Sequence, residues 1–123
     1  MTTVTPSHFL TVLFFFLLIS GGILGNAKAQ APGQGAWCVA KPSTSDEELQ
    51  NNINYACTYV DCKMIRPGGV CFEPQKLENR ASVAMNLYYQ ANGRNYWNCD
   101  FKGSGIIAVT DPSYGNCKYS FKK

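Results

Sequence analysis

Histidine is almost absent from this sequence, which contains a single one, His8, among 123 residues. His8 lies in an N-terminal segment that we expect to be removed, so the remaining chain cannot form a Ser-His or Cys-His catalytic arrangement. No pair of cysteines has the C-x-x-C spacing that is typical of zinc sites. The sequence therefore predicts neither a histidine-dependent hydrolase nor a zinc domain, and we expect no metal or other cofactor.

A strong charge of either sign is also missing. The chain has 11 basic and 8 acidic residues, and its formal net charge of +3 falls to +2 when Lys28 is removed with the N-terminal segment. The basic residues form no cluster, so nucleic acid is not an expected partner. No Asn-x-Ser/Thr sequon occurs, and the sequence ends in Phe121-Lys122-Lys123 without a hydrophobic tail. We therefore expect no N-glycosylation and no membrane anchor. We also expect the protein to be a monomer.

The N-terminus has the pattern of a secretory signal peptide. Residues 9–19 form a nearly unbroken apolar run, which is shorter than the roughly 20 apolar residues of a membrane span. The small-x-small sequence Ala27-Lys28-Ala29 follows it, as at a cleavage site. We predict a signal peptide over residues 1–29, a loose leader over 30–36 and one domain over 37–123. The alternative, a buried N-terminal helix, would require a large core around Phe14, Phe15 and Phe16.

Cysteine is plentiful where histidine is not. All six cysteines lie after the predicted signal peptide, and an even number in a short secreted chain indicates a disulfide framework. Three disulfides, each contributing about 2–4 kcal/mol, would compensate for the small core of such a domain. The spacing alone leaves the pairing open. The cysteines are Cys38, Cys57, Cys62, Cys71, Cys99 and Cys117.

Local signals predict two helices and a hairpin. Ser45 and Glu48 form a capping box at the start of a helix over residues 46–58. A second helix is predicted over residues 76–91, ended by Asn92-Gly93. The β-branched segment 106–110 is predicted as a strand, with 117–121 as its antiparallel partner.

The second helix is predicted to have an apolar and an outward face. Leu77, Ala81, Ala84, Met85, Tyr88 and Ala91 recur at helical spacing and are expected to face the core. Ser82, Asn86 and Tyr89 form the neighbouring stripe, which we expect to face solvent or a ligand. Because adjacent helical residues point in different directions, Tyr88 is predicted to pack inward and Tyr89 to be exposed.

Aromatic and amide side chains favour a sugar-binding surface over an active site. A glycosidase needs two carboxyl groups about 5–9.5 Å apart, and nothing in the sequence pairs its carboxylates, so we predict that the chain is not an enzyme. Tyr and Trp rings can stack on pyranose rings, while amides and carboxylates bind the hydroxyls. The alternative, that aromatic rings fill a small core, is preferred for Trp37, Phe72, Tyr88 and Phe101. The predicted sugar-binding residues are Tyr89, Trp97, Tyr96, Asn86 and Gln90, extended by Tyr55 and Asp61.

The ordered motifs resemble a known family. They are Trp37-Cys38-Val39-Ala40-Lys41, Cys57 with Asp61-Cys62, Pro67-Gly68-Gly69-Val70-Cys71, Ala81-Ser82-x-Ala84-x-Asn86-x-Tyr88-Tyr89-Gln90, Cys99-Asp100-Phe101-x-Gly103, and Asp111-Pro112-Ser113 with Cys117. Together they are similar to carbohydrate-binding module family 43, the plant callose-binding (β-1,3-glucan-binding) domain. That domain occurs at the C-terminus of β-1,3-glucanases, in plasmodesmal callose-binding proteins and as small secreted proteins that include pollen allergens.

The resemblance implies a fold, a set of disulfides and a function. It implies a small, disulfide-rich α+β fold, in which two packed helices accompany a small antiparallel sheet. It also implies the disulfides Cys38–Cys99, Cys57–Cys62 and Cys71–Cys117. The implied function is non-catalytic binding of β-1,3-glucan in the apoplast or cell wall by a free, pollen-allergen-like member. Arg80, Val83 and Gly105 depart from the family pattern, and a change in ligand preference is expected if those positions contact glucan.

Two other hypotheses are compatible with the sequence. A small secreted defence protein that binds lipid or another protein would also be helical and rich in disulfides. The eight-cysteine pattern of lipid-transfer proteins, with adjacent Cys-Cys and Cys-x-Cys motifs, is not found in this chain. A vestigial glycosidase is the other hypothesis, and it would release reducing ends from laminarin.

Overall fold

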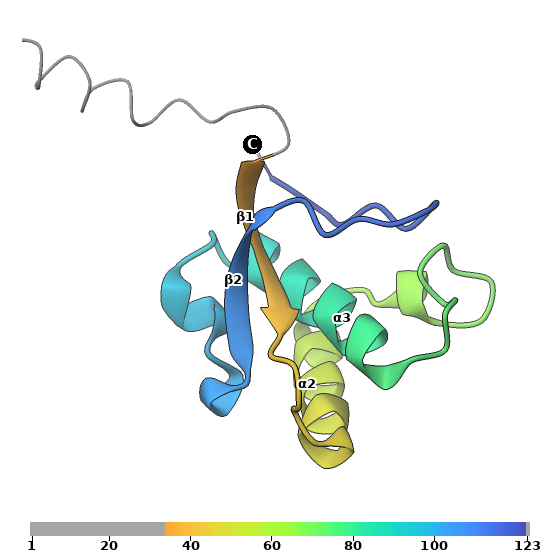
Figure 1. Cartoon of the computed structure of the whole chain (residues 1–123), viewed down its shortest axis with the longest axis horizontal. Helices are drawn as coiled ribbons and strands as arrows, with labels where there is room; N and C mark the ends of the chain where they lie inside the picture. The colour runs from red at the N-terminus through yellow and green to blue at the C-terminus, as the bar shows by residue number, and fades with distance from the viewer. Residues whose placement is uncertain (1–33, 123) are drawn as a thin grey trace, which may run out of the picture. The chain divides into compact units, whose positions relative to one another are not determined.

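Two α-helices and a two-stranded antiparallel sheet form the core of the computed structural model, which describes residues 34–122 (Figure 1). The predicted signal peptide lies outside the described residues. None of the helices in the described part of the chain is both long enough and apolar enough to cross a membrane. The elements are β1 (Gln34–Ala40), α2 (Asp46–Tyr59), η1 (Lys63–Ile65), α3 (Leu77–Ala91), η2 (Tyr96–Cys99), η3 (Phe101–Gly103) and β2 (Gly105–Thr110).

The two helices begin and end close to where local signals place them. The Glu48 backbone N–H donates a 3.2 Å hydrogen bond to Ser45 Oγ, so Ser45 caps the first turn of α2. The three acidic residues of that turn suit the positive end of the helix dipole. At the other helix, Gly93 follows the end of α3 with a φ of 91°, which is the left-handed conformation expected after a helix. Both helix predictions are confirmed.

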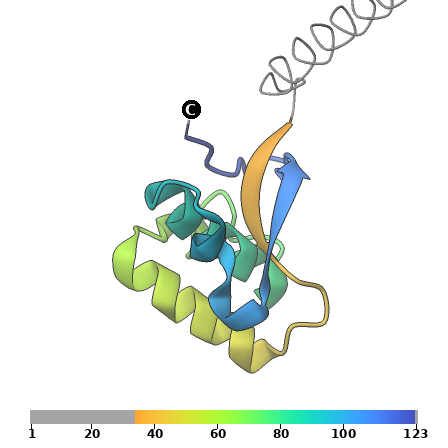
Figure 2. The same ribbon diagram turned by 90° about the vertical axis from the view of Figure 1, so that its left-hand side faces the viewer.

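The sheet pairs the first and last strands of the domain, and the predicted hairpin is wrong. β1 lies antiparallel to β2, with Cys38 opposite Ile107 and Ala40 opposite Gly105 (Figures 1 and 2). The predicted partner segment, 117–121, forms only an isolated bridge between Cys117 and Tyr114. β1 also takes in residues 34–36 of the predicted loose leader. Local turn signals favoured the sequence neighbour, whereas the actual pairing joins strands far apart in sequence and depends on tertiary packing.

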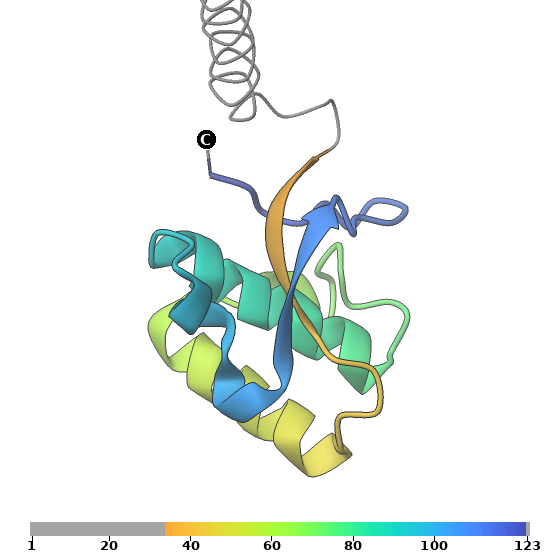
Figure 3. The same ribbon diagram turned by 60° about the vertical axis from the view of Figure 1, so that its left-hand side comes forward.

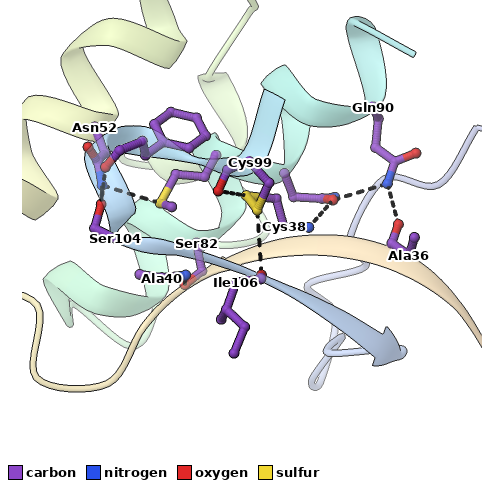
Figure 4. The surroundings of a disulfide bond; sticks show 12 residues. Ala36, Cys38, Ala40, Asn52, Ser82, Gln90, Cys99, Ser104 and Ile106 are labelled. Carbon is purple, nitrogen blue, oxygen red and sulfur yellow. Dashed lines mark hydrogen bonds between the residues drawn. A yellow bond between two sulfur atoms is a disulfide. The ribbon is translucent and has the colours of Figure 1, made fainter. Parts of the chain in front are cut away.

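The free edge of β1 is covered by side chains of α3 instead of a third strand. The backbone N–H groups of Ala40 and Cys38 donate to Ser82 Oγ (2.9 Å) and Asn86 Oδ1 (3.1 Å). Gln90 Nε2 donates to the Ala36 carbonyl oxygen at 2.8 Å (Figure 4). Four helical residues rise about 6.0 Å and two strand residues about 6.6 Å, so one polar side chain per helical turn matches alternate strand residues. We call Ser82, Asn86 and Gln90 the side-chain ladder.

The side-chain ladder overturns the predicted orientation of α3. Asn86, Tyr89 and Gln90 were expected on the outer face, but they are only 1%, 2% and 2% exposed. Tyr88, which was expected in the core, is only half-buried. The reason is that unpaired backbone groups of a buried strand edge need hydrogen-bonding partners. A polar stripe on α3 is therefore buried against β1.

Three disulfides connect these elements, and they are the pairs that the family resemblance implied. Cys38–Cys99 joins β1 to η2, and Cys71–Cys117 joins the segment before α3 to the C-terminal segment. The third, Cys57–Cys62, closes a short loop at the end of α2. The core packs around the first two bridges. Met85 and Tyr89 lie in the cluster of Cys38–Cys99, whereas Trp37, Val83 and Tyr119 lie in the cluster of Cys71–Cys117. The small, disulfide-rich α+β fold is thus confirmed.

Candidate functional site

A cleft of about 420 Å³ opens between α2, Tyr88 of α3 and the η2–η3 segment. In Figures 2 and 3 the η2–η3 segment runs alongside α2, and these two elements supply most of the lining. Four of the lining residues are aromatic: Tyr55, Tyr88, Trp97 and Phe101. The other six are polar or charged: Glu48, Asn51, Asn52, Asn98, Asp100 and Lys102. We refer to this feature as the aromatic cleft.

The aromatic residues of the cleft support one another through edge contacts. The ring centroids of Tyr55 and Tyr88 are 5.4 Å apart, and those of Tyr88 and Phe101 are 5.7 Å apart. Tyr55 and Phe101 meet at 6.2 Å with perpendicular rings. Such edge-to-face packing is the favoured geometry of aromatic pairs. Tyr55 and Trp97 nevertheless remain 49% and 60% exposed, so much of each side chain is accessible to a ligand.

The aromatic wall is held in place by a buried hydrogen-bonded chain behind it. Asn52 Nδ2 donates to Ser104 Oγ at 2.8 Å, and Ser104 Oγ donates to the Phe101 carbonyl oxygen at 2.6 Å (Figure 4). Phe101 and Lys102 adopt φ values of 44° and 55°, which L residues rarely adopt. Backbone held in such a conformation is often found at binding sites. The contact with α2 thus fixes a strained turn that carries one wall of the cleft.

The polar lining offers both donors and acceptors. Glu48 and Asn51 come from the first two turns of α2, whereas Asp100 and Lys102 flank Phe101 on the opposite wall. Asn98 has its Oδ1 buried without a hydrogen-bond partner among the described residues. Together these groups surround the rings with hydrogen-bonding atoms that suit the hydroxyls of a sugar.

The tyrosine hydroxyls inside the cleft lie close together. Tyr55 Oη and Tyr88 Oη are 3.4 Å apart. The hydrogen bond and charge repulsion of Tyr88 raise the pKa of the Tyr55 phenol above its ordinary value of 10.0, and desolvation adds to this effect. Tyr55 is therefore protonated at neutral pH and can donate a hydrogen bond to a bound hydroxyl.

The structure brings only part of the predicted sugar surface together. Tyr55 and Trp97, two of the predicted sugar-binding residues, line the aromatic cleft. Tyr96 lies just outside it, with its ring 5.2 Å from that of Trp97. Asp61 is exposed beyond the end of α2, where its Oδ1 accepts a hydrogen bond from the Lys63 backbone N–H at 2.9 Å. These positions define a cleft at α2 rather than a platform on α3.

The predicted residues of α3 lie away from the cleft. Asn86 and Gln90 are used by the side-chain ladder, and Gln90 Oε1 also accepts hydrogen bonds from Arg94 and the Lys122 backbone. Burial raises the pKa of the Tyr89 phenol, and the nearby Arg94 partly offsets this shift. The prediction that these three side chains form an exposed surface is therefore wrong.

Two residues that were predicted to lie in the core line the cleft, and several other cleft residues were not predicted. Tyr88 and Phe101 were expected to be buried, yet both line the cleft. Glu48, Asn52 and Tyr55 recur at helical spacing, and that stripe could have indicated a common face of α2. The opposite wall had no comparable signal, because the left-handed turn at 101–103 is set by its packing on α2.

The departures from the family pattern lie outside the cleft lining. Val83 is buried in the core cluster of Cys71–Cys117. Arg80 extends over the Phe72 ring, with its guanidinium carbon 6.0 Å from the ring centroid. Gly105 opens β2, and a Cβ atom at this position would collide with the Cys99 carbonyl oxygen, so glycine fits the close approach of the two backbones. These three substitutions therefore do not alter the residues that line the cleft.

Comparison with known proteins places most of this domain within one family model. The model, described as the X8 domain, matches residues 36–106. A glucan endo-1,3-beta-glucosidase of Triticum aestivum is 60% identical over 87 residues, which are 71% of this chain but only 19% of that protein. The chain thus spans about a fifth of the length of the glucosidases that it matches.

Two shorter relatives match over more of their length. The major pollen allergen Ole e 10 of Olea europaea is 44% identical over 94 residues, which are 75% of this chain and 76% of the allergen. Plasmodesmata callose-binding protein 2 of Arabidopsis thaliana is 36% identical over 85 residues, which are 68% of this chain and 44% of that protein.

Proposed function

The chain belongs to the X8 domain family, and we propose that it binds β-1,3-glucan in the aromatic cleft without cleaving it. The names of its relatives support this ligand. Some are glucan endo-1,3-beta-glucosidases, and one is a callose-binding protein. Callose is itself a β-1,3-glucan. The glucosidases share only about a fifth of their length with this chain, which supports a binding module rather than a hydrolase.

The observation that carries the proposal is the exposure of aromatic rings inside a polar-lined cleft. Tyr55 and Trp97 are 49% and 60% exposed and line the same cleft, and such a grouping of accessible aromatic side chains supports a ligand surface. A pyranose ring presents C–H groups that pack on an aromatic face, and its hydroxyls reach outward to the amides and carboxylates of the rim. The cleft has both components within one volume of about 420 Å³.

The proposed setting is outside the cell, in the plant cell wall. All six cysteines are paired in disulfides, and disulfides persist mainly in oxidising extracellular compartments. The predicted signal peptide agrees with this setting. We propose that the protein acts there as a monomer on polymeric glucan.

Affinity electrophoresis in native gels tests this function. The protein should be retarded in a gel that contains laminarin, a soluble β-1,3-glucan, and should move freely in gels that contain hydroxyethylcellulose or starch. The Trp97→Ala variant should lose most of the retardation while keeping its circular dichroism spectrum, because Trp97 is largely exposed. Val109→Ala is the matched control, since Val109 is 63% exposed on β2 and does not line the cleft.

Three results would contradict the proposal. Equal mobility in all three gels would exclude selective glucan binding. Full retention by the Trp97→Ala variant would place the site elsewhere. Reducing ends released from laminarin by the pure protein would show that the chain is an enzyme.

A further inference from the structure

One face of α2 continues past the aromatic cleft. Glu48, Asn52 and Tyr55 line the cleft, and Tyr59 follows at the same helical spacing. From Glu48 to Tyr59 this stripe extends about 16 Å along the helix axis, at about 1.5 Å per residue. Its first part is polar and its last part is aromatic, so the two ends of the stripe offer different contacts.

The Tyr59 ring packs against two aromatic residues of the cleft, but Tyr59 does not line the cleft itself. Its ring centroid lies 5.2 Å from that of Tyr55 and 5.9 Å from that of Tyr88. Even so, Tyr59 is 63% exposed, which is more than Tyr55 or Trp97. The ring is therefore held against two residues of the cleft at the end of α2, and most of its surface is free.

We propose that Tyr59 forms an additional sugar-binding position outside the aromatic cleft, so that the protein discriminates among β-1,3-glucans by chain length. This inference rests on the proposed function. A short oligosaccharide fills the cleft and leaves Tyr59 uncovered. A longer chain leaves the cleft along α2 and places a further pyranose ring on Tyr59. Polymeric glucan is consequently preferred over short fragments.

Calorimetric titration with laminarin oligosaccharides of increasing length tests the proposal. The wild-type protein should bind a hexasaccharide more tightly than a trisaccharide. The Tyr59→Ala variant should bind the trisaccharide as the wild type does, but should bind the hexasaccharide about 3- to 10-fold more weakly, the size expected for loss of one aromatic contact. Tyr59→Phe keeps the ring and should retain the preference for long chains.

Two further variants locate the effect. Tyr55→Ala should weaken the binding of both lengths, because Tyr55 lines the cleft itself. Val109→Ala should change neither, although Val109 is as exposed as Tyr59 at 63%. If Tyr59→Ala weakens both lengths equally, or weakens neither, the additional position is excluded while the proposed function stands. If the wild type binds no β-1,3-glucan of any length, the proposed function fails as well.

Discussion

Replacement of Asn86 by alanine separates two accounts of α3, one that places this residue at the sugar surface and one that places it inside the fold. Asn86 is 1% exposed and lies in the middle of the side-chain ladder. Its Oδ1 accepts hydrogen bonds from the Cys38 backbone N–H and from Gln90 Nε2, both at 3.1 Å. Its Nδ2 donates to the Ser120 carbonyl oxygen at 2.8 Å. One side chain thus connects α3 to β1 and to the C-terminal segment.

The size of the effect follows from the groups that Asn86→Ala leaves behind. Cys38 is fully buried and its N–H would lose its partner, whereas the Ser120 carbonyl is only partly buried and can reach water. Gln90 Nε2 keeps its hydrogen bond to Ala36. At about 1–3 kcal/mol for an unsatisfied buried group, the loss of the partner of the Cys38 N–H should lower the free energy of unfolding by about 1–3 kcal/mol. That is a large part of the roughly 5–15 kcal/mol that holds a typical domain together.

Denaturant unfolding with the disulfides intact measures this loss. Asn54→Ala is the matched control, because Asn54 is exposed on α2 and its side chain only accepts a surface hydrogen bond from Gln50. Its effect should stay within about 0.5 kcal/mol. Laminarin retention is recorded for both variants under conditions where they are folded, and both should bind. If Asn86→Ala leaves stability unchanged but abolishes retention, Asn86 contacts the sugar and the assignment of the side-chain ladder is refuted.

Two further predictions concern stability. Burial raises the pKa of the Tyr119 phenol, and the charge of the nearby Tyr114 raises it further. Above about pH 10.0 the unfolded chain therefore loses this proton while the folded state keeps it. The free energy of unfolding should therefore keep its full value below about pH 10 and fall at higher pH by up to about 1.4 kcal/mol per pH unit. Unfolding measured between about pH 8 and pH 11 gives this slope. An equally steep fall in the Tyr119→Phe variant would contradict the assignment of the slope to Tyr119. Removal of Cys38–Cys99, with a sequence separation of 61, should cost about 4 kcal/mol by loop entropy, against about 2 kcal/mol for Cys57–Cys62, with a separation of 5. Paired Cys→Ala variants compared by denaturant unfolding test this order, which a larger loss at Cys57–Cys62 would contradict.

Features encoded within a few residues could be predicted from the sequence. Ser45 and Glu48 lie three residues apart, so the start of α2 depends on a local hydrogen bond. Gly93 ends α3 for a similarly local reason, namely its left-handed backbone. The disulfide pairing could not be derived from spacing, and it was obtained only through the resemblance to a known family.

Features that depend on distant partners could not be predicted in the same way. Asn86 and Gln90 look like surface residues until β1 is known to present an unpaired edge beside them. The predicted inward position of Tyr88 and outward position of Tyr89 were reversed for the same reason. The apolar stripe of α3 alone does not reveal that a polar stripe is buried as well. Tyr55 and Trp97, two of the predicted sugar-binding residues, do line the cleft. They were selected for the chemistry of their aromatic side chains, and that choice did not depend on knowing which strands pair.

Nuclear magnetic resonance of the two indole groups tests the central claim most directly. Trp97 lines the aromatic cleft, whereas Trp37 is buried in the core. On titration with a laminarin oligosaccharide, the Nε1–H signal of Trp97 should shift and that of Trp37 should stay in place, as should the side-chain amide signals of Asn86 and Gln90. Shifts at Asn86 and Gln90 with an unchanged Trp97 signal would contradict the account, and so would the absence of any shift at saturating sugar.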